Sequence, residues 1–197
     1  MNKPTLRRDM VMFCALAIFG IVCAAWIDIH NVKPIAAVAL FGGVVFGRKI
    51  FAVACPLLLL WIIVFGQAVA AWPVQCCVAG GLLIGAWGGR LLREQLHRDV
   101  RRQQVLSPAL KVAVASLLGS LIFFFVSNFG WWAFTGFYPS TPGGLIGCLL
   151  SGIPFLANTV LGDLCFNAVL FGAAGCLVFQ PIKSPIWMAF KAAPLRN

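Results

Sequence analysis

The chain has 197 residues, of which 61% are hydrophobic and only 10% are charged, and its mean hydropathy is +0.97. A soluble domain carries about 25% charged residues, so this composition excludes an ordinary soluble globule and indicates a protein embedded in lipid. The net charge of +10 would favour nucleic-acid binding in a soluble protein, but Lys and Arg here occur in short segments between apolar runs. We therefore expect an all-α integral membrane protein, a single polytopic domain over residues 1–197, with the lipid bilayer and no nucleic acid as partner.

Apolar runs long enough to be membrane helices follow one another along the chain. They cover residues 11–27, 34–47, 50–66, 74–92, 109–126 and 144–179. Basic residues precede the first run as in a signal peptide, but it is long enough to cross the bilayer and further spans follow, so we interpret it as retained. The last run is too long for one straight span. Because Pro154 interrupts it, we expect a re-entrant or interfacial half-helix over residues 144–156 and a sixth span over residues 158–179.

The placement of basic residues predicts the topology. With both termini inside and six crossings, Lys33 is the only one of the 15 Lys and Arg residues on the outer side, which agrees with the positive-inside rule. We expect a multi-pass protein of the bacterial inner membrane with cytoplasmic tails at residues 1–9 and 180–197.

Small residues recur at a spacing of four on three of the apolar runs. In lipid, such stripes allow close backbone approach between helices. They predict either packing within the chain or a docking face for another membrane subunit. The residues are Gly20, Ala24, Ala39, Gly43, Gly47, Gly81, Gly85 and Gly89.

Polar and aromatic residues gather at the predicted outer side of the membrane. Aromatic rings with a few amide, imidazole and carboxyl groups suit an uncharged or mixed-polarity organic solute, although outer loops are ordinarily polar and Trp is common at interfaces. The candidate substrate-binding residues are Asp28, His30, Asn31, Gln67, Gln75, Asn128, Trp131, Trp132, Tyr138, Asn158, Asp163 and Asn167.

Asp163 is the most informative of these candidates, because ionisable residues within apolar spans are rare and usually functional. Asn167 follows one helical turn later on the same face. The alternative is an acid near a helix N-terminus that the helix dipole stabilises, with Thr159 as the N-cap. Ser116 and Ser120 are predicted to bond to backbone carbonyls or to a neighbouring helix.

The cysteines and motifs argue against a metalloprotein or an enzyme. Apart from Cys76 and Cys77 near the outer end of the fourth run, the other six of the eight cysteines lie inside apolar runs. Cys behaves there as a small hydrophobic residue, so we expect no disulfide framework, metal site or cofactor. Cys76 and Cys77 could contact a soft metal centre within a substrate, although packing is the simpler interpretation. The chain has neither a phosphate-loop motif nor a nucleophile with an evident base, so we expect no enzymatic activity and no ATP hydrolysis by the chain itself.

Three segments resemble the motifs of a family of small bacterial membrane proteins of unknown function. They read NVKPIAAVALFGG at residues 31–43, LGSLIFFFVSNFG at residues 118–130 and IPFLANTVLGD at residues 153–163. That family is regarded as transport proteins, akin to the substrate-binding S components of energy-coupling-factor transporters. Those S components are six-helix proteins that capture vitamins or similar micronutrients, with or without a shared ATPase module. The resemblance implies functional roles for Asn31, Asn128, Asn158 and Asp163.

The chain departs from that family at one position. Members commonly have an Asp late in the third span, where this chain reads WIIV at residues 61–64, so the solute cannot be carried over from the relatives. The resulting expectation is a substrate-binding, S-component-like subunit for uptake of a vitamin or similar micronutrient. The alternatives are a non-transporting membrane scaffold or assembly factor and, with the least support, an intramembrane enzyme acting on lipid.

Overall fold

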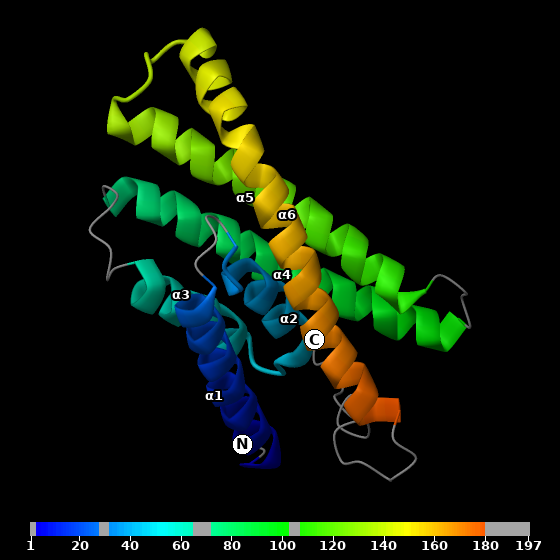
Figure 1. The fold of residues 1–197 in the computed structure, drawn as a ribbon. Coiled ribbons are helices and arrows are strands. Elements are labelled where there is room, and N and C mark those ends of the chain that lie inside the picture. Colours follow the sequence, from blue (N-terminus) through cyan, green and yellow to red (C-terminus); the bar gives the residue numbers. More distant parts are fainter. Residues whose placement is uncertain (1–2, 28–31, 65–71, 103–106, 180–197) are drawn as a thin grey trace.

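The computed structural model describes residues 3–27, 32–64, 72–102 and 107–179. Every regular element within these residues is an α-helix (Figure 1). The elements are α1 (Lys3–Trp26), α2 (Ile35–Val45), α3 (Lys49–Val64), α4 (Trp72–Arg102), α5 (Pro108–Thr135) and α6 (Pro142–Phe179).

The shortest helix, α2, lies at the centre of the bundle. It contacts each of the other five helices, and all of its 11 residues except Ala36 are buried. A helix of this length extends only about 16 Å at 1.5 Å per residue, which is too short to cross a bilayer alone. Because surrounding helices cover it, its ends need not reach the lipid headgroups.

Two glycines allow α2 and α4 to touch through their backbones. A Cβ atom on Gly43 would overlap the carbonyl oxygen of Ala86, and a Cβ atom on Gly89 would overlap that of Leu40. Gly85 faces Ala39 at the same crossing. Such close approach gives dispersion contact along the whole interface, which is the main attraction between helices in lipid.

The other small residues also lie at contacts within the chain. A Cβ atom on Gly20 of α1 would lie 2.5 Å from Leu59 Cδ1 of α3, and one on Gly81 of α4 would lie 3.0 Å from Phe123 Cδ2 of α5. The carbonyl of Ala24 accepts a hydrogen bond from Lys33. Each of these small residues therefore lies at a contact inside this bundle.

The last apolar region differs from its predicted form. Residues 144–156 and 158–179 belong to one continuous helix, α6, of 38 residues, so the structure has no separate half-helix. Pro154 removes a single backbone hydrogen bond, and an exposed Pro is tolerated within a membrane helix. The fifth run is also longer than predicted, since α5 continues to Thr135 and ends at Gly136, whose φ of 69° is left-handed.

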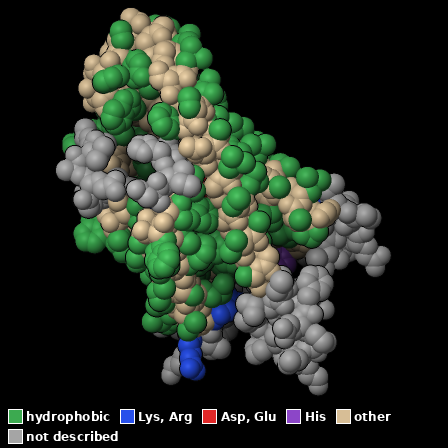
Figure 2. Space-filling view, in the orientation of Figure 1, with side chains coloured by type: hydrophobic (Ala, Val, Ile, Leu, Met, Phe, Trp, Pro, Cys, Tyr) green, Lys and Arg blue, Asp and Glu red, His purple; other side chains and the backbone are tan. Residues whose placement is uncertain are grey.

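Four helices are long and apolar enough to cross a membrane: α1, α4, α5 and α6. Large apolar side chains such as Trp61, Trp87 and Leu161 lie exposed on their outer faces or on α3. Figure 2 shows hydrophobic side chains over most of the visible face and Lys or Arg side chains only near the end where α1 begins. A surface of this kind suits lipid rather than water.

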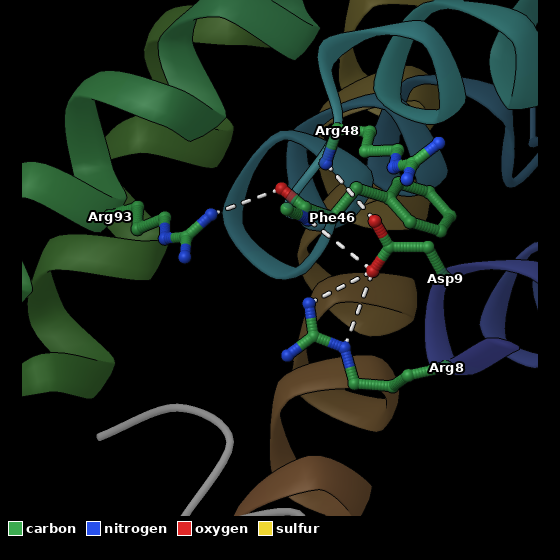
Figure 3. A network of polar contacts seen from close by, with 6 residues as sticks. Arg8, Asp9, Phe46, Arg48 and Arg93 are labelled. Carbon is green, nitrogen blue, oxygen red and sulfur yellow. Dashed lines mark hydrogen bonds and ion pairs between the residues drawn. The ribbon is translucent and has the colours of Figure 1, made fainter. Parts of the chain in front are cut away.

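The basic end of the bundle is defined by Arg8, Arg48 and Arg93, which meet around Asp9 and Phe46 (Figure 3). The Asp9 carboxylate, fully buried, accepts hydrogen bonds from the backbone N–H groups of Gly47 at 3.4 Å and Arg48 at 3.0 Å. It also pairs with the Arg8 guanidinium at 2.9 Å. It therefore satisfies free N–H groups at the N-terminus of α3.

A second side chain fixes the same junction from the opposite side. The Arg93 guanidinium on α4 donates to the carbonyl of Phe46 at 3.0 Å. The predicted N-terminal tail therefore differs from the structure over residues 3–9, which form the first turns of α1 and hold the connection between α2 and α3. The predicted C-terminal tail, residues 180–197, lies outside the described residues.

Candidate functional site

A cavity of about 630 Å³ lies between α2, α3, α4, α5 and α6, away from the basic end. We call it the solute cavity. Its wall is formed by the beginnings of α2 and α4, the last turns of α5, Tyr138 and one face of α6. Cavities of about 300–1,000 Å³ with mostly apolar walls are typical of small-molecule sites.

Three helices and one connecting residue bring polar groups into this mostly apolar space. Gln75 comes from α4, Asn128 and Trp131 from α5, Tyr138 from the α5–α6 connection and Asp163 from α6. The Oε1 atom of Gln75 is buried and has no hydrogen-bond partner among the described residues. A buried carbonyl oxygen without a partner is costly, so this atom is suited to accept a hydrogen bond from a bound molecule.

A single ammonium group also lines the solute cavity. The Nζ atom of Lys33 donates to the carbonyl oxygens of Ile27 at 2.9 Å and Ala24 at 3.2 Å. These two bonds cap the end of α1. Among the described residues, these two carbonyls use two of the three donors of the ammonium group, and the third can serve another acceptor.

The structure brings together five of the predicted substrate-binding residues at the solute cavity. These are Gln75, Asn128, Trp131, Tyr138 and Asp163. Four other candidates, Asp28, His30, Asn31 and Gln67, lie outside the described residues.

The three remaining candidates lie elsewhere. The indole N–H of Trp132 donates to the Pro139 carbonyl at 2.9 Å, which closes the α5–α6 connection, and Trp132 does not line the solute cavity. Asn158 does not line it either. Asn167 is one turn deeper and lines a separate small cavity.

Asp163 belongs to a buried polar cluster between α5 and α6. The Ser120 hydroxyl contacts Asp163 Oδ2 at 2.6 Å and the Ser116 carbonyl oxygen at 3.0 Å. Asn167 follows Asp163 by one turn of α6, and Ser116 precedes Ser120 by one turn of α5. The Asn167 side-chain NH₂ donates to the Ser116 hydroxyl at 3.0 Å. The prediction that these serines bond to a carbonyl or to a neighbouring helix is confirmed, and the Ser120 hydroxyl lies within hydrogen-bonding distance of both kinds of partner.

Neither Cys76 nor Cys77 lines the solute cavity. Cys76 is exposed on the outer face of α4, and the Cys77 side chain packs against Gly130 of α5. Packing against α5 therefore accounts for Cys77. The described residues also hold no cluster of three or more His, Cys, Asp or Glu side chains.

Several wall residues of α6 were not predicted. Cys148, Gly152, Leu156 and Thr159 line the solute cavity together with the predicted Asp163, at intervals of three to four residues along one helix face. This periodicity is present in the sequence, but it indicates a face only if the helix continues past Pro154. Asp9 was also missed, because its partners lie about 40 residues away at the α2–α3 connection.

Comparison with known proteins gives a family but no described activity. No curated protein and no solved structure matches this chain. One family model, described as a family of unknown function, DUF6580, matches residues 5–184. Because that match covers nearly the whole chain, including every helix that surrounds the solute cavity, the chain belongs to the DUF6580 family.

Proposed function

We propose that the protein is a membrane transport protein that binds a small organic solute of vitamin size in the solute cavity and delivers it into the cell. In this respect it would act like the S components of energy-coupling-factor transporters. The observation that supports the proposal is the cavity of about 630 Å³ with an apolar wall and a few convergent polar groups. Its volume is within the range of sites that bind small organic molecules.

The wall chemistry favours a solute with a flat or aliphatic body and several hydrogen-bonding groups. Trp131, Phe123 and Phe124 supply apolar and aromatic area. The amides of Gln75 and Asn128 can orient carbonyl, amide or hydroxyl groups, and Gln75 Oε1 requires a donor on the solute. The third donor of Lys33 favours an acceptor on the solute, such as a carbonyl or carboxylate group.

The proposed topology has six crossings, with both termini in the cytoplasm of a bacterial cell and the chain in its inner membrane. The gathering of Arg8, Arg48 and Arg93 at the basic end supports it, because basic residues are concentrated on the cytoplasmic side. The solute cavity lies toward the opposite end of the helices and would then open outward. An outward cavity suits capture of a scarce nutrient.

The energy for uptake would come from outside the chain. The sequence has no phosphate-loop motif, so an ATPase partner module or an ion gradient would drive release inward. The scaffold alternative depends on small-residue faces that are free for a partner. In this bundle Gly43, Gly81 and Gly89 lie at contacts between its own helices, so no specific observation favours that alternative.

Native mass spectrometry of the protein extracted from its own membranes tests the proposal. We expect one small molecule to remain bound to each chain, and its mass identifies the compound class. The Gln75→Met variant keeps the volume of the side chain and removes its hydrogen-bonding groups. It should weaken binding by about tenfold, the value of one or two hydrogen bonds.

The same substitution at the next position, Cys76→Met, is the matched control, because Cys76 faces away from the solute cavity. It should leave binding unchanged. Gln75→Met should also leave the free protein at least as stable as the wild type, because its buried oxygen has no partner to lose. The proposal fails if the wild-type protein retains no small molecule and if no compound from a panel of vitamins, cofactors and metabolites raises its unfolding temperature.

A further inference from the structure

A second, much smaller cavity lies next to the solute cavity, where α2, α4, α5 and α6 meet. Its volume is about 20 Å³, enough for one water-sized particle. Four polar side chains contribute to its wall: Ser116, Ser120, Asp163 and Asn167. Each is at most 4% exposed, so these groups are removed from bulk water and from lipid.

Two features of this polar cluster require a partner. The Oδ1 atom of Asn167, a side chain that is only 2% exposed, has no hydrogen-bond partner among the described residues. The Asp163 carboxylate receives one hydroxyl contact, from Ser120. An acceptor without a donor and a carboxylate without a counter-ion both destabilise a buried site.

The rest of the small cavity offers no compensating charge. Its other walls are formed by Ala, Gly, Leu and Phe residues of α2, α4 and α5. Lys33 lines the solute cavity instead, and its ammonium group bonds to carbonyls at the end of α1. The site therefore combines a carboxylate, one oxygen atom without a hydrogen-bond partner among the described residues and space for one small particle.

We propose that this small cavity binds one sodium ion. Asp163, Asn167 Oδ1 and the two serine hydroxyls form an all-oxygen set, and hard cations prefer oxygen ligands. One carboxylate neutralises one positive charge. A divalent ion would leave an uncompensated charge within the bilayer, which is costly. A water molecule would satisfy Asn167 Oδ1 but would leave the carboxylate charge without a counter-ion.

The sodium site shares a wall with the solute cavity, because Asp163 lines both. An ion at Asp163 would change the charge that a bound solute meets, and a bound solute would change the affinity for the ion, since such coupling is reciprocal. This coupling rests on the proposed transport function, whereas the ion site itself does not. A sodium gradient would then supply energy for uptake.

The test uses the full-length protein in lipid nanodiscs, without any solute, at fixed pH and ionic strength. Radioactive sodium should bind saturably with one ion per chain, and sodium chloride should raise the unfolding temperature more than potassium or choline chloride does. Asp163→Asn and Asn167→Leu should each weaken sodium binding by at least about tenfold. Cys165→Ala, two residues from Asp163 but exposed on the outer face of α6, should bind sodium like the wild type.

Three results would overturn the proposal. The first is a folded wild-type protein without saturable sodium binding, which would mean that the small cavity holds water or that Asn167 turns its NH₂ group toward it. The second is stabilisation that depends on pH and not on sodium, which would assign a proton to Asp163. The third is unchanged sodium affinity in Asp163→Asn. If Asp163→Asn does not fold, Asn167→Ser replaces it, because this variant shortens one ligand and keeps the carboxylate. Asn167→Ser should lower the affinity for sodium, and an unchanged affinity would also refute the site.

These outcomes are separate from those for the solute cavity. Sodium binding is measured without solute, and solute retention is measured by mass. A protein that binds sodium but no organic molecule would refute the proposed function and leave the ion site intact. A protein that retains a solute but binds no sodium would refute the ion site and leave the proposed function intact.

Discussion

Replacing Gly89 by Ala should destabilise the protein far more than the same change at the neighbouring Gly88. Both glycines lie within α4, so their effects on helix propensity are alike and favour Ala by about 1 kcal/mol. The new Cβ atom at position 89 would overlap the Leu40 carbonyl oxygen and lie 2.9 Å from Gly43 Cα. The new Cβ atom at position 88 would have no heavy atom within 4 Å.

The size of the effect follows from what must move. The obstacle at Gly89 is backbone of α2 and not a flexible side chain, so it can be relieved only if α2 and α4 separate. A gap of about 0.5–1 Å forfeits a quarter to a half of each dispersion contact, and this loss extends along the interface. Overpacking costs about 1–3 kcal/mol in ordinary cores, and we expect about 3 kcal/mol here.

The assay is thermal unfolding of the purified variants in one detergent, followed by intrinsic tryptophan fluorescence. Gly89→Ala should lower the unfolding temperature by about 6–12 °C, and Gly88→Ala should leave it unchanged or slightly raised. Gly43→Ala, on the other side of the same contact, should resemble Gly89→Ala. Equal stability of the Gly88 and Gly89 variants would refute the backbone contact between α2 and α4.

Three further predictions address the basic end, the polar cluster and the topology. Asp9→Ala removes the acceptor for two backbone N–H groups and for Arg8, and it should lower the free energy of unfolding by about 2–3 kcal/mol, measured by thermal unfolding. Arg7→Ala, at an exposed position, is the control and should have little effect. Equal stability of the two variants would show that Asp9 does not hold the α2–α3 connection. Ser120→Ala leaves the Asp163 carboxylate without its hydroxyl contact and should lower the free energy of unfolding by about 1–3 kcal/mol. The control, Ser151→Ala, should change it negligibly, because the exposed Ser151 hydroxyl donates to Gly147 of its own helix. In a cysteine-free background, Gln95→Cys should react with an impermeant maleimide only in inside-out vesicles, and Ser140→Cys should react only in intact cells. The reverse pattern would invert the topology and place the solute cavity on the cytoplasmic side.

The sequence predicted the class of fold because the signals for membrane helices are local. Hydrophobic runs of sufficient length identify α1, α4, α5 and α6 without any knowledge of their neighbours. The stripe containing Gly85 and Gly89 likewise indicated a close helix contact. Length and composition alone therefore predict a helical protein with helices long and apolar enough to cross a membrane.

The residues that each side chain contacts could not be predicted from these local signals. Whether a helix continues past Pro154 depends on how neighbouring helices support it, so the face of α6 that lines the solute cavity was not recognised. The burial of α2 on nearly every side, and the choice of Leu40 and Gly43 as the contacts of Gly89, depend on the arrangement of the other helices.

Charged residues show the same division. The sequence by itself determined that Asp163 is unusual, because an acid within an apolar run is costly wherever it lies. Only the tertiary structure decided that Asp163 meets Ser120 and lines two cavities, and that Asp9 holds the N-terminus of α3. Hydropathy is a property of each segment, whereas a hydrogen bond between residues some 40 positions apart exists only once the helices have packed.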